Sequence, residues 1–238
     1  MSAFRYAFEA SACGGVRVAV GDTAVICRAS GALWLEAART LVVADLHFEK
    51  GSAFAARGQL LPPYDTRETL NRLEAEVSAL APRRLVFLGD SFHDGGGEAR
   101  LAASDRARVG ALASGRDLIW VVGNHDADGP RGLPGDVVAD LALGGLTLTH
   151  EPTVGASAGQ IAGHLHPCVR VKARGASTRR RCFATDASRL ILPAFGAYAG
   201  GLNLREAAFA PLFVRAPLAI VLGNGKAHAV GWASLVGD

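Results

Sequence analysis

Val121-Val-Gly-Asn-His-Asp126 joins an apolar run to a glycine and three consecutive polar residues. The run from Asp117 to Val122 is short and bounded by turn residues, which predicts a strand buried on both faces. Gly123 allows a sharp turn at the carboxyl end of this strand, where open α/β sheets bind ligands. We therefore expect the three polar residues at the rim of a sheet, where an amide oxygen beside an imidazole suits a metal or a phosphate site.

Four further apolar runs end in residues of the same kind. Each run predicts a buried strand, and aspartate or histidine follows each run directly or after a single glycine. The four exits are Asp45-Leu-His47, Gly89-Asp90, His150 and Gly163-His-Leu-His166.

The order of the predicted elements indicates how these strands are arranged. Strands at residues 40–44, 84–88 and 117–122 alternate with helices at 65–80, where Asp65 is the expected N-cap, and at about 98–114. This alternation predicts a largely parallel sheet with helices packed on it. The stretch through Gly58 and the Pro62-Pro63 pair is expected to be mobile. The strand-rich last third predicts a second sheet packed on the first, and without a linker we expect one domain over residues 1–238.

Composition limits the class of protein without naming a substrate. Half of the 238 residues are hydrophobic, and the net charge of +3 is too mild to imply nucleic acid or an anionic membrane. The four cysteines are widely spaced, and we interpret them as reduced thiols of a cytosolic protein. Neither a secretory signal nor a membrane span is recognisable, so we expect a cytoplasmic protein.

The strand exits together supply a set of nitrogen and oxygen donors without thiolate, which suits Mn, Fe or Zn. Taken alone, each exit also fits a capped strand end, an ordinary turn or a buried core histidine; together they favour a metal centre. There are too many donors for one tetrahedral ion, and a shared carboxylate would hold two ions roughly 3.5 to 4 Å apart, able to acidify a water that attacks phosphorus. The donors are Asp45, His47, Asp90, Asn124, His150, His164 and His166.

In this order the five motifs, which span residues 45 to 166, resemble the motif set of the calcineurin-like metallophosphoesterase superfamily. The resemblance implies an α/β protein of the α+β sandwich type, with two packed mixed β-sheets flanked by helices. It implies that His125 protonates the leaving oxygen or stabilises the transition state, oriented by the Asp126 carboxylate. It also implies two metal sites that share Asp90: Asp45, His47, Asp90 and His166 for the first ion, and Asp90, Asn124, His150 and His164 for the second.

Segments outside these motifs, such as Val43–Gly51, Arg83–His93 and Leu192–Gly201, resemble the bacterial PdeM group more narrowly. That group is described as a ligase-associated DNA damage response endonuclease, a manganese-dependent phosphodiesterase. The resemblance implies two divalent ions, Mn above Fe or Zn, and a DNA or RNA substrate. It also implies a functional association with an ATP-dependent DNA ligase, a helicase and an exonuclease.

A basic segment follows the last histidine motif, with seven basic residues and one acid between Pro167 and Arg189. It predicts a track for the phosphate backbone of a nucleic acid, although a solvated basic hairpin has the same composition. His93, Asp94 and Lys50 lie close to the motifs but are not assigned to the site. The residues predicted to bind nucleic acid are Arg170, Lys172, Arg174, Arg179, Arg180 and Arg181.

Three functions therefore stay open from the sequence. The first is a dimetal phosphodiesterase that acts on DNA or RNA. The second is the same enzyme acting on a small diester, such as a cyclic nucleotide, a dinucleoside polyphosphate or a nucleotide-lipid diester. The third is a scaffold without turnover, which the complete set of ligands disfavours.

Overall fold

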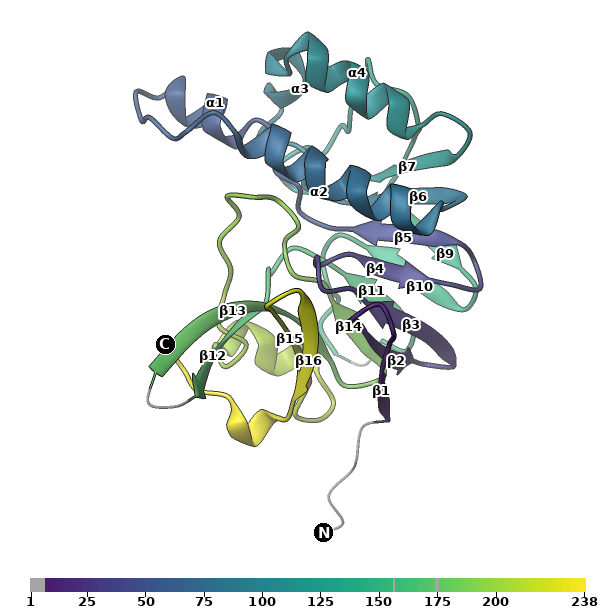
Figure 1. The fold of residues 1–238 in the computed structure, drawn as a ribbon, viewed down its shortest axis with the longest axis vertical. Helices are drawn as coiled ribbons and strands as arrows, with labels where there is room; N and C mark the ends of the chain where they lie inside the picture. The colour runs from purple at the N-terminus through teal and green to yellow at the C-terminus, as the bar shows by residue number, and fades with distance from the viewer. Residues whose placement is uncertain (1–6, 156, 174–175) are drawn as a thin grey trace.

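Two β-sheets face each other in the computed structural model, which describes residues 7–155, 157–173 and 176–238 (Figure 1). The strands β1 to β5 of the first sheet are antiparallel, and β5 to β8 are parallel. This sheet is therefore mixed: the strands that alternate with helices are parallel, as predicted, and the N-terminal strands are antiparallel because short connections join them. Its order is β1 (Phe8–Ala10), β2 (Val16–Val20), β3 (Thr23–Cys27), β4 (Leu33–Leu35), β5 (Thr40–Val43), β6 (Arg84–Leu88), β7 (Asp117–Val121) and β8 (Asp136–Val138).

The second sheet is built from the last third of the chain and is also mixed. Its strands β10, β11 and β14 are parallel neighbours, while the strands around them are antiparallel. Two packed mixed sheets confirm the predicted fold class. The order is β16 (Lys226–Val230), β15 (Leu218–Gly223), β13 (Ala176–Thr185), β14 (Arg189–Ile191), β11 (Gln160–Ala162), β10 (Leu146–Thr149) and β9 (Asp140–Leu143), with β12 (Cys168–Ala173) paired to β13.

Three apolar layers hold this arrangement together. One lies between the sheets and contains Val86, Leu148 and Phe183. Leu85, the neighbour of Val86, points to the opposite face of the first sheet because side chains alternate along a strand, and there it packs with helical residues such as Leu70. A third layer covers the outer face of the second sheet.

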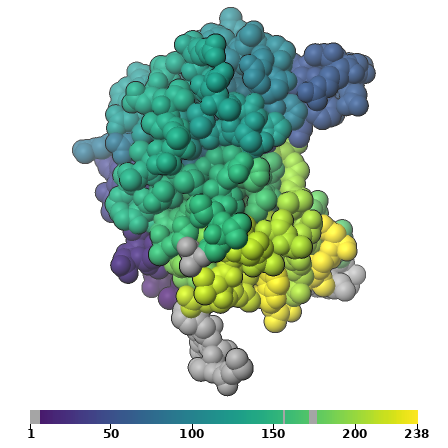
Figure 2. All heavy atoms as spheres, turned by 180° about the vertical axis from the view of Figure 1, so that it is seen from behind, coloured from purple at the N-terminus to yellow at the C-terminus, as the bar shows by residue number. Residues whose placement is uncertain are grey.

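The α-helices lie on the outer face of the first sheet, at the top of Figure 1, whereas the 3₁₀ turns pack against the second sheet. The C-terminal residues, yellow in Figure 2, lie at the other end of the molecule, against the second sheet. No helix in the described ranges is long and apolar enough to cross a membrane. The helices are α1 (Lys50–Ala55), α2 (Asp65–Leu80), α3 (Gly97–Arg100), α4 (Ala103–Leu112), and the 3₁₀ turns η1 (Ala207–Leu212) and η2 (Trp232–Ser234).

Three helical predictions were wrong in detail. The single helix expected at 98–114 is two helices, because Leu101 and Ala102 have extended backbone with ψ of 124° and 145°. The stretch expected to be mobile contains α1. Asp65 is the first residue of α2 and not its cap; its buried carboxylate accepts the Gly51 N–H at 3.0 Å and so ties α1 to α2.

We expect Leu148→Ala to lower the free energy of unfolding by about 2–5 kcal/mol, because it opens a cavity between the sheets. Leu148 is fully buried there. Leu60→Ala is the matched control, since Leu60 is 89% exposed and its loss should change stability by less than about 0.5 kcal/mol. Denaturant titration measures both, and equal effects of the two substitutions would contradict the layer assignment.

Candidate metal centre

Each predicted metal ligand lies just beyond the carboxyl end of a strand. In the first sheet β5, β6 and β7 are adjacent and parallel, and in the second sheet β10 and β11 are adjacent and parallel. Their exits therefore meet at one edge of the sandwich. Asp45 and His47 follow β5, Asp90 follows β6, Asn124 follows β7, His150 follows β10, and His164 and His166 follow β11.

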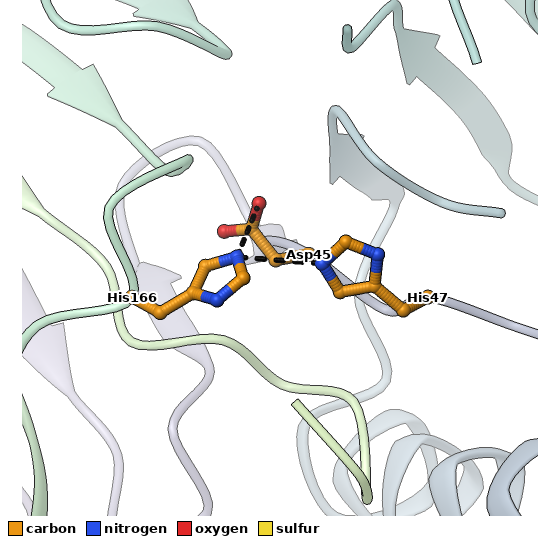
Figure 3. Close-up of side chains that lie close together, drawn as sticks. All are labelled: Asp45, His47 and His166. Atoms are coloured by element: carbon orange, nitrogen blue, oxygen red, sulfur yellow. Dashed lines mark hydrogen bonds and ion pairs between the residues drawn. The ribbon is translucent and has the colours of Figure 1, made fainter. Parts of the chain in front are cut away.

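Asp45, His47 and His166 form the first group of ligands (Figure 3). The Asp45 Oδ1 atom lies 3.2 Å from Nε2 of His166, which lies 3.4 Å from Nε2 of His47. Asp45 is fully buried and His47 nearly so. One carboxylate and one imidazole from the first sheet thus meet an imidazole from the second.

Asp90, His150 and His164 form the second group. Nε2 of His150 lies 3.4 Å from Oδ1 of Asp90 and 3.2 Å from Nδ1 of His164. The side-chain oxygen of Asn124 lies 3.0 Å from each of these two ring nitrogens. The structure therefore brings all four predicted ligands of this group together.

The donor atoms fit divalent ions. In each group two imidazole nitrogens face each other at a distance that leaves room for a single proton or cation between them. Nδ1 of His150 donates to the Leu88 carbonyl at 3.3 Å, which leaves Nε2 directed at the group. Burial alone lowers the pKa of His150, but the hydrogen bond to Asp90 and the charges of Asp45 and Asp90 raise it to about 9. The site therefore favours positive charge.

Close approach of backbone and side chain depends on glycines that precede the ligands. A Cβ on Gly163 would lie 2.7 Å from Oδ2 of Asp45. A Cβ on Gly89 would overlap the His150 ring, and one on Gly123 would overlap Asp90. These contacts explain why each of the three motifs contains glycine before its donor.

His125 lies beside Asp90 and His47, with its side chain 41% exposed and its ring centroid 5.3 Å from that of His47. Its Nδ1 lies 2.8 Å from the His93 carbonyl oxygen and must donate the hydrogen, so Nε2 faces the cleft, 3.9 Å from Oδ2 of Asp90. The His93 ring also stacks on the His125 ring, with centroids 5.5 Å apart. The sequence did not assign His93 to the site; its position three residues after Asp90, in the same strand exit, was the available signal.

The Asp126 carboxylate, which was expected to orient His125, binds backbone N–H groups instead. Its carboxylate accepts the backbone N–H groups of Ser91, Phe92 and Gly123 at 2.8 to 3.1 Å. Burial, and then the nearby Asp90 charge, raise the pKa of Asp126 to about 6 against these hydrogen bonds. Asp126 thus links the segments that follow β6 and β7 through hydrogen bonds. The His93 carbonyl, rather than Asp126, accepts the hydrogen bond that orients the His125 ring.

Comparison with known proteins agrees with this geometry. The family model described as calcineurin-like phosphoesterase matches residues 38–167, more than half of the chain. This chain belongs to the calcineurin-like phosphoesterases. It is therefore a member of a hydrolase family, as the motifs predicted, and it carries two His/Asp groups suited to a dinuclear metal site.

Two solved structures resemble this phosphoesterase. The crystal structure of Pseudomonas putida nuclease MPE matches with 26% identity and a TM-score of 0.70, covering 91% of this chain and 100% of that one. Yfce, a phosphoesterase from E. coli, matches with 15% identity and a TM-score of 0.40, covering 81% and 98% of the two chains. A search of the curated proteins found no match. The likeness to the nuclease extends past the motifs, as the narrower resemblance predicted.

The predicted nucleic-acid track is only partly available to a substrate. Arg174 lies outside the described residues, and of Lys172 only the backbone in β12 is described. Arg170 and Arg179 lie 3.5 and 3.1 Å from the two carboxylate oxygens of Asp238. Their charges are therefore partly offset by this carboxylate.

Arg181 and Arg180 differ from each other although they are neighbours. The Arg181 guanidinium donates to the carbonyl oxygens of Ala194, Gly196, Ala197 and Ala199 at 2.8 to 3.2 Å. It supports the segment that follows β14. Arg180 is exposed, and within the described ranges it has no hydrogen-bond or ion-pair partner.

We expect Gly89→Ala to abolish metal binding at the second group, because the added methyl group displaces the His150 ring and Gly89 has a φ of +75°. Gly110→Ala is the matched control, since nothing lies within 4 Å of its Cβ position in α4. Metal content after dialysis against Mn²⁺, and the rise in melting temperature on Mn²⁺ addition, measure the effect. Full metal content in the Gly89 variant would contradict the close approach.

Proposed function

We propose that this phosphoesterase is a two-metal phosphodiesterase that cleaves nucleic acid, as a DNA endonuclease in a ligase-associated repair system. The observation that carries the proposal is the pair of carboxylate and histidine groups, which approach each other where Nδ1 of His150 lies 3.8 Å from Oδ1 of Asp45, with Nε2 of His125 3.9 Å from Asp90. The similarity to nuclease MPE supports nucleic acid as the substrate class. The functional association with a ligase, a helicase and an exonuclease follows from the sequence resemblance and stays a prediction.

In this proposal Asp90 is the carboxylate that the two ions would share. Its Oδ1 faces His150 of the second group, and its Oδ2 points toward the cleft. Burial raises the pKa of Asp90. The hydrogen bond and charge of His150, the backbone N–H of His125 and the charge of His47, a member of the first group, together lower this pKa to about 2. Asp90 thus interacts electrostatically with both groups and stays ionised. The first ion is then held by Asp45, His47, Asp90 and His166, and the second by Asp90, Asn124, His150 and His164.

Two divalent ions, when bound, supply a nucleophile at neutral pH and offset the negative charge that develops on the phosphate. The donors suit Mn, and also Fe or Zn, because they combine imidazole nitrogens with carboxylate and amide oxygens. The protein contributes the positions of these donors, which are fixed by buried strand ends.

His125 handles the proton in this mechanism. Because the His93 carbonyl occupies Nδ1, only Nε2 is directed to the cleft, where it can donate a hydrogen bond or a proton to the leaving oxygen. Asp126 is a positioning residue, since it holds the strand exits around Asp90 and His125 without touching the cleft side of the ring.

We expect the Mn²⁺-loaded protein to hydrolyse bis-p-nitrophenyl phosphate, and metal-stripped protein to be inactive. His125→Ala should lower kcat by about 10²- to 10⁴-fold, as expected for loss of a general acid. Asp90→Asn should lower both metal content and turnover. His228→Ala is the matched control, because His228 is an exposed histidine on β16, away from the centre.

Substrate class is tested with the same preparations. Single-stranded and nicked DNA should be cut with the same dependence on metal, Asp90 and His125, and the monoester should be the poorer small substrate. Turnover of small diesters without any cleavage of nucleic acid would replace the nuclease proposal by the small-diester alternative. Bound metal without turnover of any diester would leave only the scaffold.

A further inference from the structure

A cavity of about 410 Å³ lies between α2, β13 and the turn that joins β15 to β16. Its walls contain four arginines, and the other lining residues are small, polar or apolar. Among the described residues no carboxylate lines it. The arginines are Arg72, Arg179, Arg180 and Arg181.

Arg72 enters this cavity from α2 with part of its donor capacity unused. It donates one N–H to the Phe195 carbonyl, and its guanidinium lies 4.8 Å from the centroid of the Phe195 ring. Its buried Nε atom has no hydrogen-bond partner. The carboxylate whose charge acts on Arg72 is that of Glu68, which does not line the cavity. A buried donor without a partner is costly, and Arg72 lines the cavity with no carboxylate among the described lining residues.

Arg181 is held by backbone carbonyls on either side of the one that Arg72 contacts, and these carbonyls accept hydrogen bonds but carry no full negative charge. Burial, followed by the charge of Arg72, lowers the pKa of Arg181 to about 10. Arg72 and Arg181 therefore repel each other. Arg180 adds a third cation, exposed and without a partner among the described residues.

The cavity lies directly behind the first metal group. The backbone N–H of Gly196 donates to the Asp45 carbonyl oxygen at 3.0 Å, while the Gly196 carbonyl accepts from Arg181 at 2.8 Å. Phe195, which Arg72 contacts, donates its N–H to the Ala44 carbonyl at 2.8 Å. One backbone segment thus contacts a metal ligand on one side and the arginines on the other.

We propose that this cavity binds a phosphodiester group of the substrate strand other than the one that is cut. The inference rests on the proposed nucleic-acid substrate. Guanidinium groups bind phosphate oxygens through paired hydrogen bonds. Arg72 and Arg181 are fixed by their carbonyl contacts and provide a pre-organised positive wall, and Arg180 closes on the phosphate from the solvent side.

The test compares Arg180→Ala with Arg84→Ala in the Mn²⁺-loaded enzyme. Arg84 is the control because it pairs with Asp117 at the amino ends of β6 and β7, opposite the metal centre. For an oligonucleotide of about ten residues, Arg180→Ala should lower kcat/KM about three- to tenfold at low salt. The slope of log kcat/KM against log salt should become less negative by about 0.7, the value for one lost contact to a single strand. Turnover of bis-p-nitrophenyl phosphate is measured in both variants, so that a loss at the metal centre is told apart from a loss of strand binding.

The outcomes separate the cavity from the proposed function. If the wild-type enzyme cuts DNA and Arg180→Ala equals Arg84→Ala at every salt concentration, the cavity does not bind the strand, and the nuclease function stands. If the wild-type enzyme turns over only small diesters, the nucleic-acid substrate fails and the inference fails with it. Inorganic phosphate is the probe for a free anion: if it alters small-diester turnover only when Arg180 is present, and oligonucleotide kinetics are equal in both variants, the cavity is an anion site unrelated to the strand.

Discussion

The Asp45 carboxylate is the point at which the two sheets depend on each other. It leaves β5 of the first sheet, is fully buried, and accepts the backbone N–H of His164 from the second sheet at 3.1 and 3.2 Å. It also lies within 3.8 Å of ring nitrogens of His150 and His166. A buried carboxylate is strongly destabilising unless it is paired and hydrogen-bonded, and here its partners come from the second sheet. Packing of the sheets and assembly of the metal centre are therefore one event.

The same crowding shapes the backbone of the ligands. Five of the seven proposed ligands have a positive φ, between 45° and 70°: Asp45, His47, Asp90, His164 and His166. Each such residue costs of the order of 1–3 kcal/mol and persists only where its surroundings hold it. Backbone hydrogen bonds between the exits do so here: Asp45 donates to Gly89, and His47 to Asp90. This strain is retained because it turns the donors of separate strands toward common points.

Features set by a local sequence pattern were predictable, and features set by contacts between distant segments were not. Strand exits were visible because apolar runs end abruptly in donors, so the ligands and the family followed from local patterns. Helix α1 was not visible because its six residues are too few to form a stable helix alone, and its partner Asp65 lies in the next helix. The contacts of His93 and Asp126 could not be predicted for a similar reason. They depend on which backbone groups two separate exits bring together, and no residue pattern records this.

The number of basic residues in the segment from Pro167 to Arg189 did not predict how many of them are accessible to a substrate. Arg189 belongs to the basic segment, yet it is 1% exposed and donates to the carbonyls of Thr153 and Gly155 at 2.7 Å. The same distinction applies to acids, since Asp94 beside the centre pairs with Arg100 at 2.7 Å.

Two cavities near the metal centre differ in the charged residues that line them. The one beside His125 is lined by Asp94, Glu98, Asp126, Asp128 and Arg131, and the one behind Asp45 by arginines without any acid among the described lining residues. The acids of the first cavity are paired, Asp94 with Arg100 at 2.7 Å and Asp128 with Arg131 at 2.9 Å, so the difference in charge between the two cavities comes from the arginines of the second. A strand bound across the centre would then have a preferred direction, with its charged backbone on the arginine side.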